Sequence, residues 1–199
     1  MLFVIFKLMQ KFKDILIWAG LLAIFLSPLF FWLPLDHYDP WTSLGQVSAL
    51  IGLVMYSVNI VLSSFVPQWR KHHMIGGIAF ILIMLHPLFL AAALVPSGAK
   101  YAMSYILPGD NWMINLGIIS LLLTMILLFL TFLVILPYKY WKLTHKFLGL
   151  AFFLGVLHGF LVESNLTREM PLKIYMLIVV SVGFLFWLKH SILDPIRGK

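Results

Sequence analysis

The sequence predicts an all-α membrane protein built as a bundle of six transmembrane helices. Of its 199 residues, 62% are hydrophobic, and the mean hydropathy is +1.02, whereas an average soluble domain is roughly 45–50% apolar. Only 11% of the residues are charged, and they lie between long apolar runs. Because a charge near the bilayer centre is costly, the charged residues mark the loops. A spanning helix needs about 20 residues, so we expect residues 1–199 to form a single transmembrane domain with no room for a second folded domain.

Six apolar runs of suitable length follow one another along the chain. The connectors between them contain proline and glycine, which interrupt helices. The N-terminal 14 residues contain three lysines and no small-residue cleavage site follows, so they indicate an interfacial stretch and not a signal peptide. The predicted spans lie near residues 15–35, 44–66, 74–95, 112–137, 147–162 and 172–188.

The basic residues predict the orientation. With a cytoplasmic N-terminus, eleven lysines and arginines fall on the cytoplasmic side, and only Lys100, Arg168 and Lys173 fall outside. We therefore expect a multi-pass protein of a bacterial inner (plasma) membrane with both termini in the cytoplasm. The net charge of +7 is scattered singly, so no nucleic-acid partner is predicted. The absence of cysteine excludes disulfides, thiolate metal sites and iron–sulfur clusters.

Two histidines lie inside predicted spans, where an ionisable side chain needs a reason. His86 is 12 residues beyond Met74 in the third span, and His158 is 11 residues beyond Phe147 in the fifth. Both therefore lie about 17 to 18 Å from the cytoplasmic edge. At the cytoplasmic mouths of the same two spans are the pair His72 and His73, and His145.

Two histidines at one level on two helices can supply both axial ligands of a haem iron. Two such levels predict two stacked haems between the third and fifth spans. His72 and His86 are 14 residues apart, about 21 Å of rise and within roughly 40° of one helix face. His73 is 13 residues from His86 and turns about 140° away, so His72 is preferred. His145 and His158 are also 13 apart: either His145 lies at a frayed helix start, or the two haems approach that helix from different sides.

Several neighbouring residues admit both a haem-related and an ordinary explanation. The glycines between the histidine levels either give a flat ring access to the backbone or pack helices. Phe152 and Phe153 either fill the space between haems or belong to the core. Arg70, Lys71 and Lys146 are candidate partners of haem propionates or plain cytoplasmic charges; Arg168 and Lys173 are candidates for attracting an anionic acceptor. His37 and His190 are expected to be interfacial. The glycines concerned are Gly76, Gly77, Gly149 and Gly155.

The segments HHMIGGIAFILIMLHPLF and WKLTHKFLGLAFFLGVLHGF resemble the two haem-binding helices of the ferric reductase-like transmembrane domain family. That family includes NADPH oxidases, ferric-chelate reductases and the haem subunit of a bacterial methionine sulfoxide reductase, whose fourth helix the segment INLGIIS also resembles. The resemblance implies that His72 and His145 bind an inner b-type haem and that His86 and His158 bind an outer one. Family members usually continue into a cytoplasmic flavin and nicotinamide domain, whereas this sequence stops soon after the sixth span. Either a separate donor supplies electrons or these residues are the membrane part of a longer protein.

These observations predict the haem subunit of a membrane oxidoreductase that carries electrons through two bis-histidine b-type haems. The expected donor is a flavoprotein with FAD or FMN, or a quinol, on the cytoplasmic side. Candidate acceptors on the outer face are ferric iron, oxygen and a periplasmic protein. The alternative is a small histidine-lined proton or metal-ion transporter, which would need more polar residues than the spans offer. A membrane scaffold with incidental histidines would tolerate alanine at His86 or His158.

Overall fold

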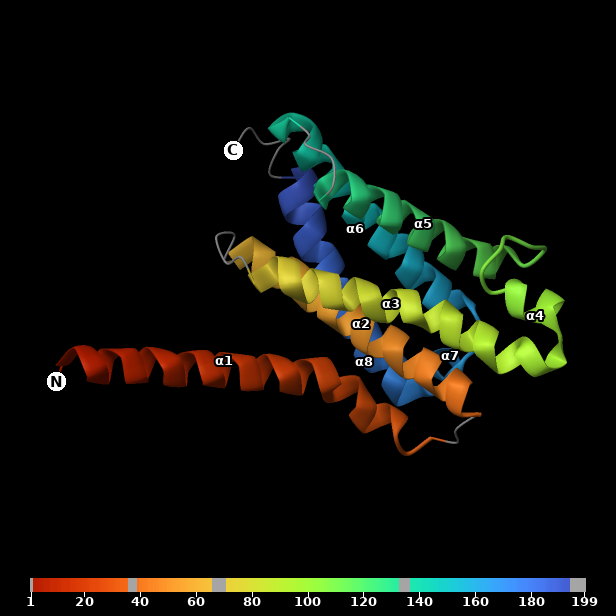
Figure 1. Cartoon of the computed structure of the whole chain (residues 1–199), viewed down its shortest axis with the longest axis horizontal. Helices are drawn as coiled ribbons and strands as arrows, with labels where there is room; N and C mark the ends of the chain where they lie inside the picture. The colour runs from red at the N-terminus through yellow and green to blue at the C-terminus, as the bar shows by residue number, and fades with distance from the viewer. Residues whose placement is uncertain (1, 36–38, 66–70, 133–136, 194–199) are drawn as a thin grey trace.

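The computed structural model describes residues 2–35, 39–65, 71–132 and 137–193, with the side chains of residues 2–11, 132 and 145 outside the description. All the regular secondary structure in these ranges is helical, which confirms the all-α prediction (Figure 1). The elements in chain order are α1 (Leu2–Trp32), α2 (Pro40–Phe65), α3 (Lys71–Leu94), the 3₁₀ turn η1 (Val95–Ser97), α4 (Ala99–Met103), α5 (Trp112–Phe132), α6 (Tyr138–Leu161), α7 (Asn165–Arg168), α8 (Met170–Leu188) and the π-helical turn η2 (Lys189–Leu193).

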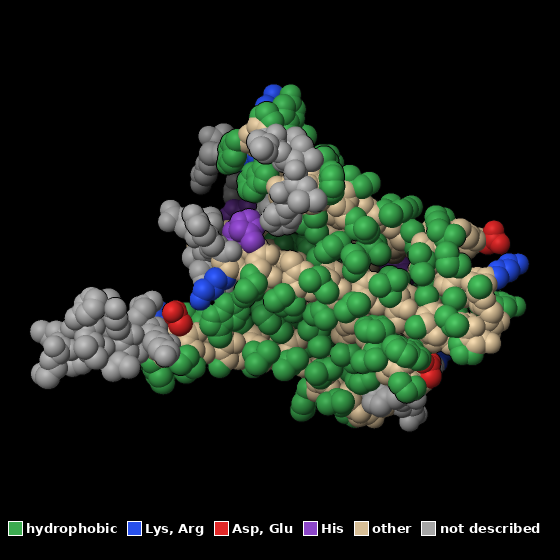
Figure 2. Space-filling model, viewed as in Figure 1, with side chains coloured by type: hydrophobic (Ala, Val, Ile, Leu, Met, Phe, Trp, Pro, Cys, Tyr) green, Lys and Arg blue, Asp and Glu red, His purple; other side chains and the backbone are tan. Residues whose placement is uncertain are grey.

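Six helices are long and apolar enough to cross a membrane, as the sequence predicted. The first of these helices begins on the same side of the bundle on which the last one ends (Figure 1). Many large apolar side chains face outward, among them Phe30 at 79% exposure and Phe65 at 69%. Charged side chains gather toward the ends of the bundle, and the surface between them is largely apolar (Figure 2). Lipid is the solvent that such a surface favours. The candidate spans are Phe12–Trp32, Pro40–Phe65, Lys71–Ser97, Trp112–Thr131, Tyr138–Leu161 and Met170–Leu193.

The helix ends differ from the predicted ones where polar and aromatic residues continue an apolar run. α6 begins at Tyr138 instead of near residue 147, and the sixth span continues through η2 to Leu193. An apolar environment offers the backbone no other hydrogen-bond partners, and long amphipathic side chains reach the interface from within a helix. The N-terminal stretch is part of α1, whose first half extends beyond the other helices (Figure 1).

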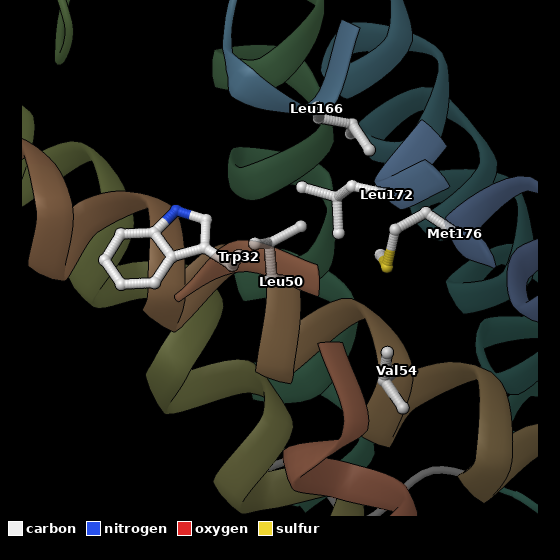
Figure 3. Packing of buried hydrophobic residues seen from close by; sticks show 6 residues of the cluster. All are labelled: Trp32, Leu50, Val54, Leu166, Leu172 and Met176. Carbon is white, nitrogen blue, oxygen red and sulfur yellow. The ribbon is translucent and has the colours of Figure 1, made fainter. Parts of the chain in front are cut away.

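The helices pack as two groups. α2 packs along α3 and also contacts α1 and α8, while α5 packs along α6. α3 and α6 are not among the closely packed pairs in the part of the chain that the structure describes. A core near the C-terminal end of α1 joins α1, α2, α7 and α8 (Figure 3). Its buried members are Trp32, Leu50, Val54, Leu166, Leu172 and Met176.

The start of α2 is fixed by the residue before it. The carboxylate of Asp39 accepts hydrogen bonds from the backbone N–H groups of Trp41 and Thr42, at 3.0 and 3.1 Å, and from the hydroxyl of Thr42 at 2.5 Å. This is the arrangement that stabilises a helix N-terminus. The Thr42 hydroxyl, followed by the backbone bonds, holds the pKa of Asp39 below its ordinary value. The cap thereby fixes the end of α2 that leads to the cavity described next.

Candidate haem site

A cavity of about 550 Å³ lies between the two helix groups. Residues of α2 and α3 line one wall and residues of α5 and α6 line the other, and both His86 and His158 are among them. The volume falls within the range of roughly 300 to 1,000 Å³ that small-molecule and cofactor sites occupy. The cavity is therefore the place in the described structure where two histidines from different helices face one ligand-sized space.

His86 is held by the neighbouring helix α2. Its Nδ1 lies 3.0 Å from the backbone carbonyl oxygen of Gly45. A Cβ atom at Gly45 would lie 3.3 Å from the carbonyl oxygen of His86 and 3.1 Å from a methyl of Leu90. Glycine at position 45 thus lets α2 and α3 approach closely enough for this hydrogen bond.

His158 is held in the same way by α5. Its Nδ1 lies 2.7 Å from the backbone carbonyl oxygen of Met113. Its ring lies directly over Gly117, where a Cβ atom would come within 2.8 to 2.9 Å of three ring carbons. The first turn of α5 that carries Met113 is itself capped, because Asn111 Oδ1 accepts from the backbone N–H groups of Met113 and Ile114. Asn111, Met113 and Gly117 together set the orientation of the His158 ring.

The two hydrogen bonds decide the chemistry of both imidazoles. A carbonyl oxygen only accepts, so Nδ1 is the protonated nitrogen in each neutral ring and Nε2 carries the lone pair. Metal-binding histidines use this arrangement widely, with the second nitrogen donating to a carbonyl that fixes tautomer and ring orientation. The residues at the cavity therefore fit a haem, which His86 and His158 would hold through their Nε2 atoms.

The inner part of the cavity is lined by a stacked aromatic pair. The rings of Tyr56 and Phe152 lie 4.8 Å apart at 8°, and the Tyr56 hydroxyl donates to the carbonyl of Leu148 at 3.2 Å. Phe153 instead lies against Phe184 of α8, with ring centroids 5.0 Å apart. Of the two phenylalanines considered from the sequence, Phe152 is the one at the cavity.

The prediction that His86 and His158 lie at one membrane depth stays a prediction, although the helix starts differ from those from which it was counted. His86 is 15 residues after the start of α3 and His158 is 20 after the start of α6, because α6 begins earlier than its apolar run. The two residues nevertheless share one cavity. The earlier start also excludes the frayed-end explanation for His145, which lies seven residues inside α6. Of the two alternatives for the 13-residue spacing, the one in which two haems would approach α6 from different sides stays a prediction.

The predicted inner site is described only in part. His72 is half-buried and His73 exposed, with ring centroids 3.9 Å apart. The side chain of His145 lies outside the described residues, as do Arg70 and His37. The preference for His72 over His73 and the pairing of His72 with His145 therefore remain predictions. Within the described ranges, no three histidine, aspartate or glutamate side chains are grouped as a metal site.

The glycines between the histidine levels mostly pack against side chains. A Cβ atom would meet Asn59 at Gly76, Trp187 at Gly149 and the Ser120 hydroxyl at Gly155, whereas Gly77 faces open space. Gly155 also lines the cavity. The ordinary packing explanation therefore holds for Gly76 and Gly149.

Two candidate cations already have aromatic or acidic partners. The Lys71 ammonium lies 5.1 Å from the centroid of the Trp18 ring, which is a cation–π contact. The Arg168 guanidinium lies 2.6 Å from the Glu163 carboxylate. Because Glu163 balances its charge, Arg168 is a weaker attractor for an anionic acceptor than the sequence indicated.

Sequence reasoning missed Gly45, Met113 and Gly117. Every residue has a backbone carbonyl, so the sequence does not show which carbonyl accepts a hydrogen bond from a histidine. Nor does it distinguish a glycine that contacts a histidine ring from any other helical glycine. Only the contact between helices identifies them.

Alanine at Gly117 is expected to weaken haem binding at this site by about 10- to 100-fold, the usual effect of disturbing a residue that orients a metal ligand. The new methyl group overlaps the His158 ring and forces it away from Met113. Haem content and the rate of haem release measure the effect. Gly20→Ala in α1 is the matched control, since nothing lies within 4 Å of its added Cβ and α1 carries no candidate haem ligand. Equal haem retention by both variants would contradict the assignment.

Comparison of the chain with models of known protein families finds no match, and comparison with curated proteins finds none either.

Proposed function

We propose that this chain is the haem-holding part of a membrane oxidoreductase, which passes electrons from a donor on the cytoplasmic side to an acceptor on the outer face. The observation that carries the proposal is the pair His86 and His158 on one cavity, each with Nδ1 bonded to a backbone carbonyl. A bound b-type haem supplies one-electron redox chemistry. The resemblance of the two histidine segments to the ferric reductase-like family supports the same function.

The residues of the chain contribute binding, orientation and exclusion of water. The carbonyls of Gly45 and Met113 fix the two imidazoles, and glycine at position 117 makes room for one of them. The apolar lining raises the cost of adding charge, which is a lever on haem potential. In the proposed scheme His72 and His145 hold a second haem nearer the cytoplasm, and a flavoprotein or a quinol delivers the electrons. Ferric iron, oxygen and a periplasmic protein remain the candidate acceptors.

The test combines haem quantification with transfer across a membrane. Purified protein is expected to show a b-type reduced-minus-oxidised spectrum with about two haems per chain by pyridine extraction. In lipid vesicles that contain sealed cytochrome c, external dithionite is expected to reduce the cytochrome faster than in protein-free vesicles. Protein expressed with ample haem that binds none would refute the proposal, and transfer no faster than in empty vesicles would refute the conduit.

A further inference from the structure

Three residues from distant parts of the chain form a hydrogen-bond network beside the cavity. The Trp32 indole N–H of α1 and the Asn165 amide N–H of α7 both donate to Oε1 of Gln46 on α2, each at 3.2 Å. Trp32 and Asn165 are only 6% and 8% exposed. Buried polar networks are costly unless satisfied, so the position of the Gln46 side chain is closely specified.

The network determines which way the Gln46 amide faces. An indole nitrogen only donates, so the atom it contacts must be the oxygen. Oε1 then receives two hydrogen bonds, one for each lone pair, and Nε2 keeps two N–H donors. Gln46 lines the cavity, and among the described residues nothing accepts a hydrogen bond from Nε2. A fixed donor is thus left for whatever occupies the cavity.

The lining indicates the chemistry of that occupant. The outer end of the cavity carries polar side chains, whereas the rest of the lining, apart from the two histidines, is mainly apolar or aromatic. Ser120 and Thr124 also line it, but their hydroxyls donate to the backbone carbonyls of Ala151 and Ser120. Among the described residues that line the cavity, Glu163 is the single charged one, and its carboxylate is bonded to Arg168. The cavity therefore suits a ligand with an apolar body and an oxygen-bearing edge that neutral donors recognise. The polar side chains at the outer end are Thr42, Gln46, Tyr105, Ser164 and Asn165.

We propose that the Gln46 carboxamide donates a hydrogen bond to a ligand carboxylate at the outer end of this cavity. The inference rests on the proposed function, in which that carboxylate belongs to the propionate edge of the haem held by His86 and His158. Charge-assisted hydrogen bonds are the strong ones in such sites. Gln46 is therefore a binding residue that selects the ionised edge of the ligand, and it neither ligates the metal nor exchanges electrons.

The test changes both partners of the proposed hydrogen bond: the propionates of the ligand are esterified, and the Gln46 donor is removed. The release rates of haem b and of its dimethyl ester are measured for wild type and for Gln46→Met. The kinetic phase that belongs to the His86 site is identified as the one that His86→Ala lacks. The ratio of ester release to haem b release is expected to be about tenfold greater in wild type, because hydrogen bonds to charged groups have about this effect. Ser63→Ala, whose hydroxyl bonds only to its own helix at Ile60, is the matched control and is expected to keep the wild-type ratio.

The outcomes separate this inference from the function it rests on. An unchanged ratio in Gln46→Met, with haem bound to wild type, would overturn the role of Gln46 alone. Wild type without haem would instead overturn the proposed function. If Gln46→Met does not accumulate, Gln46→Glu keeps an oxygen for Trp32 and Asn165 and removes the donor, so it is expected to lose the same discrimination.

Discussion

On the proposed function, alanine at His86 and alanine at His158 are each expected to lower the haem content from two per chain to about one, because each variant would lose a ligand of the same haem. The double variant is expected to lose no more than either single variant, since groups that act as one unit are not additive. His72→Ala is expected to remove the other haem, so its combination with His86→Ala leaves none. Pyridine extraction and the reduced-minus-oxidised spectrum measure all five variants.

His190→Ala is the control for these variants. His190 lies in η2 at the end of the last span, beside Phe186, with ring centroids 6.2 Å apart. The His190→Ala substitution removes an imidazole near the membrane surface and leaves the cavity lining unchanged, so this variant is expected to keep the wild-type haem content. Two retained haems in either His86→Ala or His158→Ala would contradict the assignment of these residues as a ligand pair.

The fold was predictable because the bilayer limits what a chain can do. Runs of about 20 apolar residues specify spans whose backbone must satisfy its own hydrogen bonds. The ends were less predictable, as Tyr138 shows, because helices continue through aromatic and lysine residues that suit the interface. The predicted start of α6 near residue 147 was too late, so the depth of His158 that was counted from it stays a prediction. Counting residues from an apolar boundary inherits every error in that boundary.

The sequence could predict the titratable residues of the candidate site but not the residues that hold them in place. A histidine in an apolar span is visible in a sequence, so His86 and His158 could be selected. Their hydrogen-bond acceptors are backbone atoms of residues 41 and 45 positions away along the chain. The Trp32–Gln46–Asn165 network likewise joins three helices that only the packing brings together. Such contacts depend on helix rotation and register, which hydropathy does not specify.

Alanine at Gly149 is expected to be among the most damaging single substitutions in the bundle. The Trp187 indole of α8 occupies the space directly over Gly149 of α6, so an added methyl group overlaps the ring. The same indole donates to the carbonyl of Lys146 at 3.0 Å, a hydrogen bond that a displaced ring loses. Overpacking costs about 1–3 kcal/mol and the lost hydrogen bond about 1 kcal/mol. With a shift of about 2–4 °C per kcal/mol, the midpoint of thermal unfolding in detergent is expected to fall by about 5–10 °C.

A double-mutant comparison separates this overlap from a general intolerance of α6 to alanine. In a Trp187→Ala background the ring is absent, so Gly149→Ala is expected to cost nothing or to stabilise slightly, as alanine normally does within a helix. Gly20→Ala in α1, with nothing within 4 Å of the added Cβ, is the control in the wild-type background. The same loss from Gly149→Ala with and without Trp187 would show that the close approach of α6 and α8 at this point is not its cause.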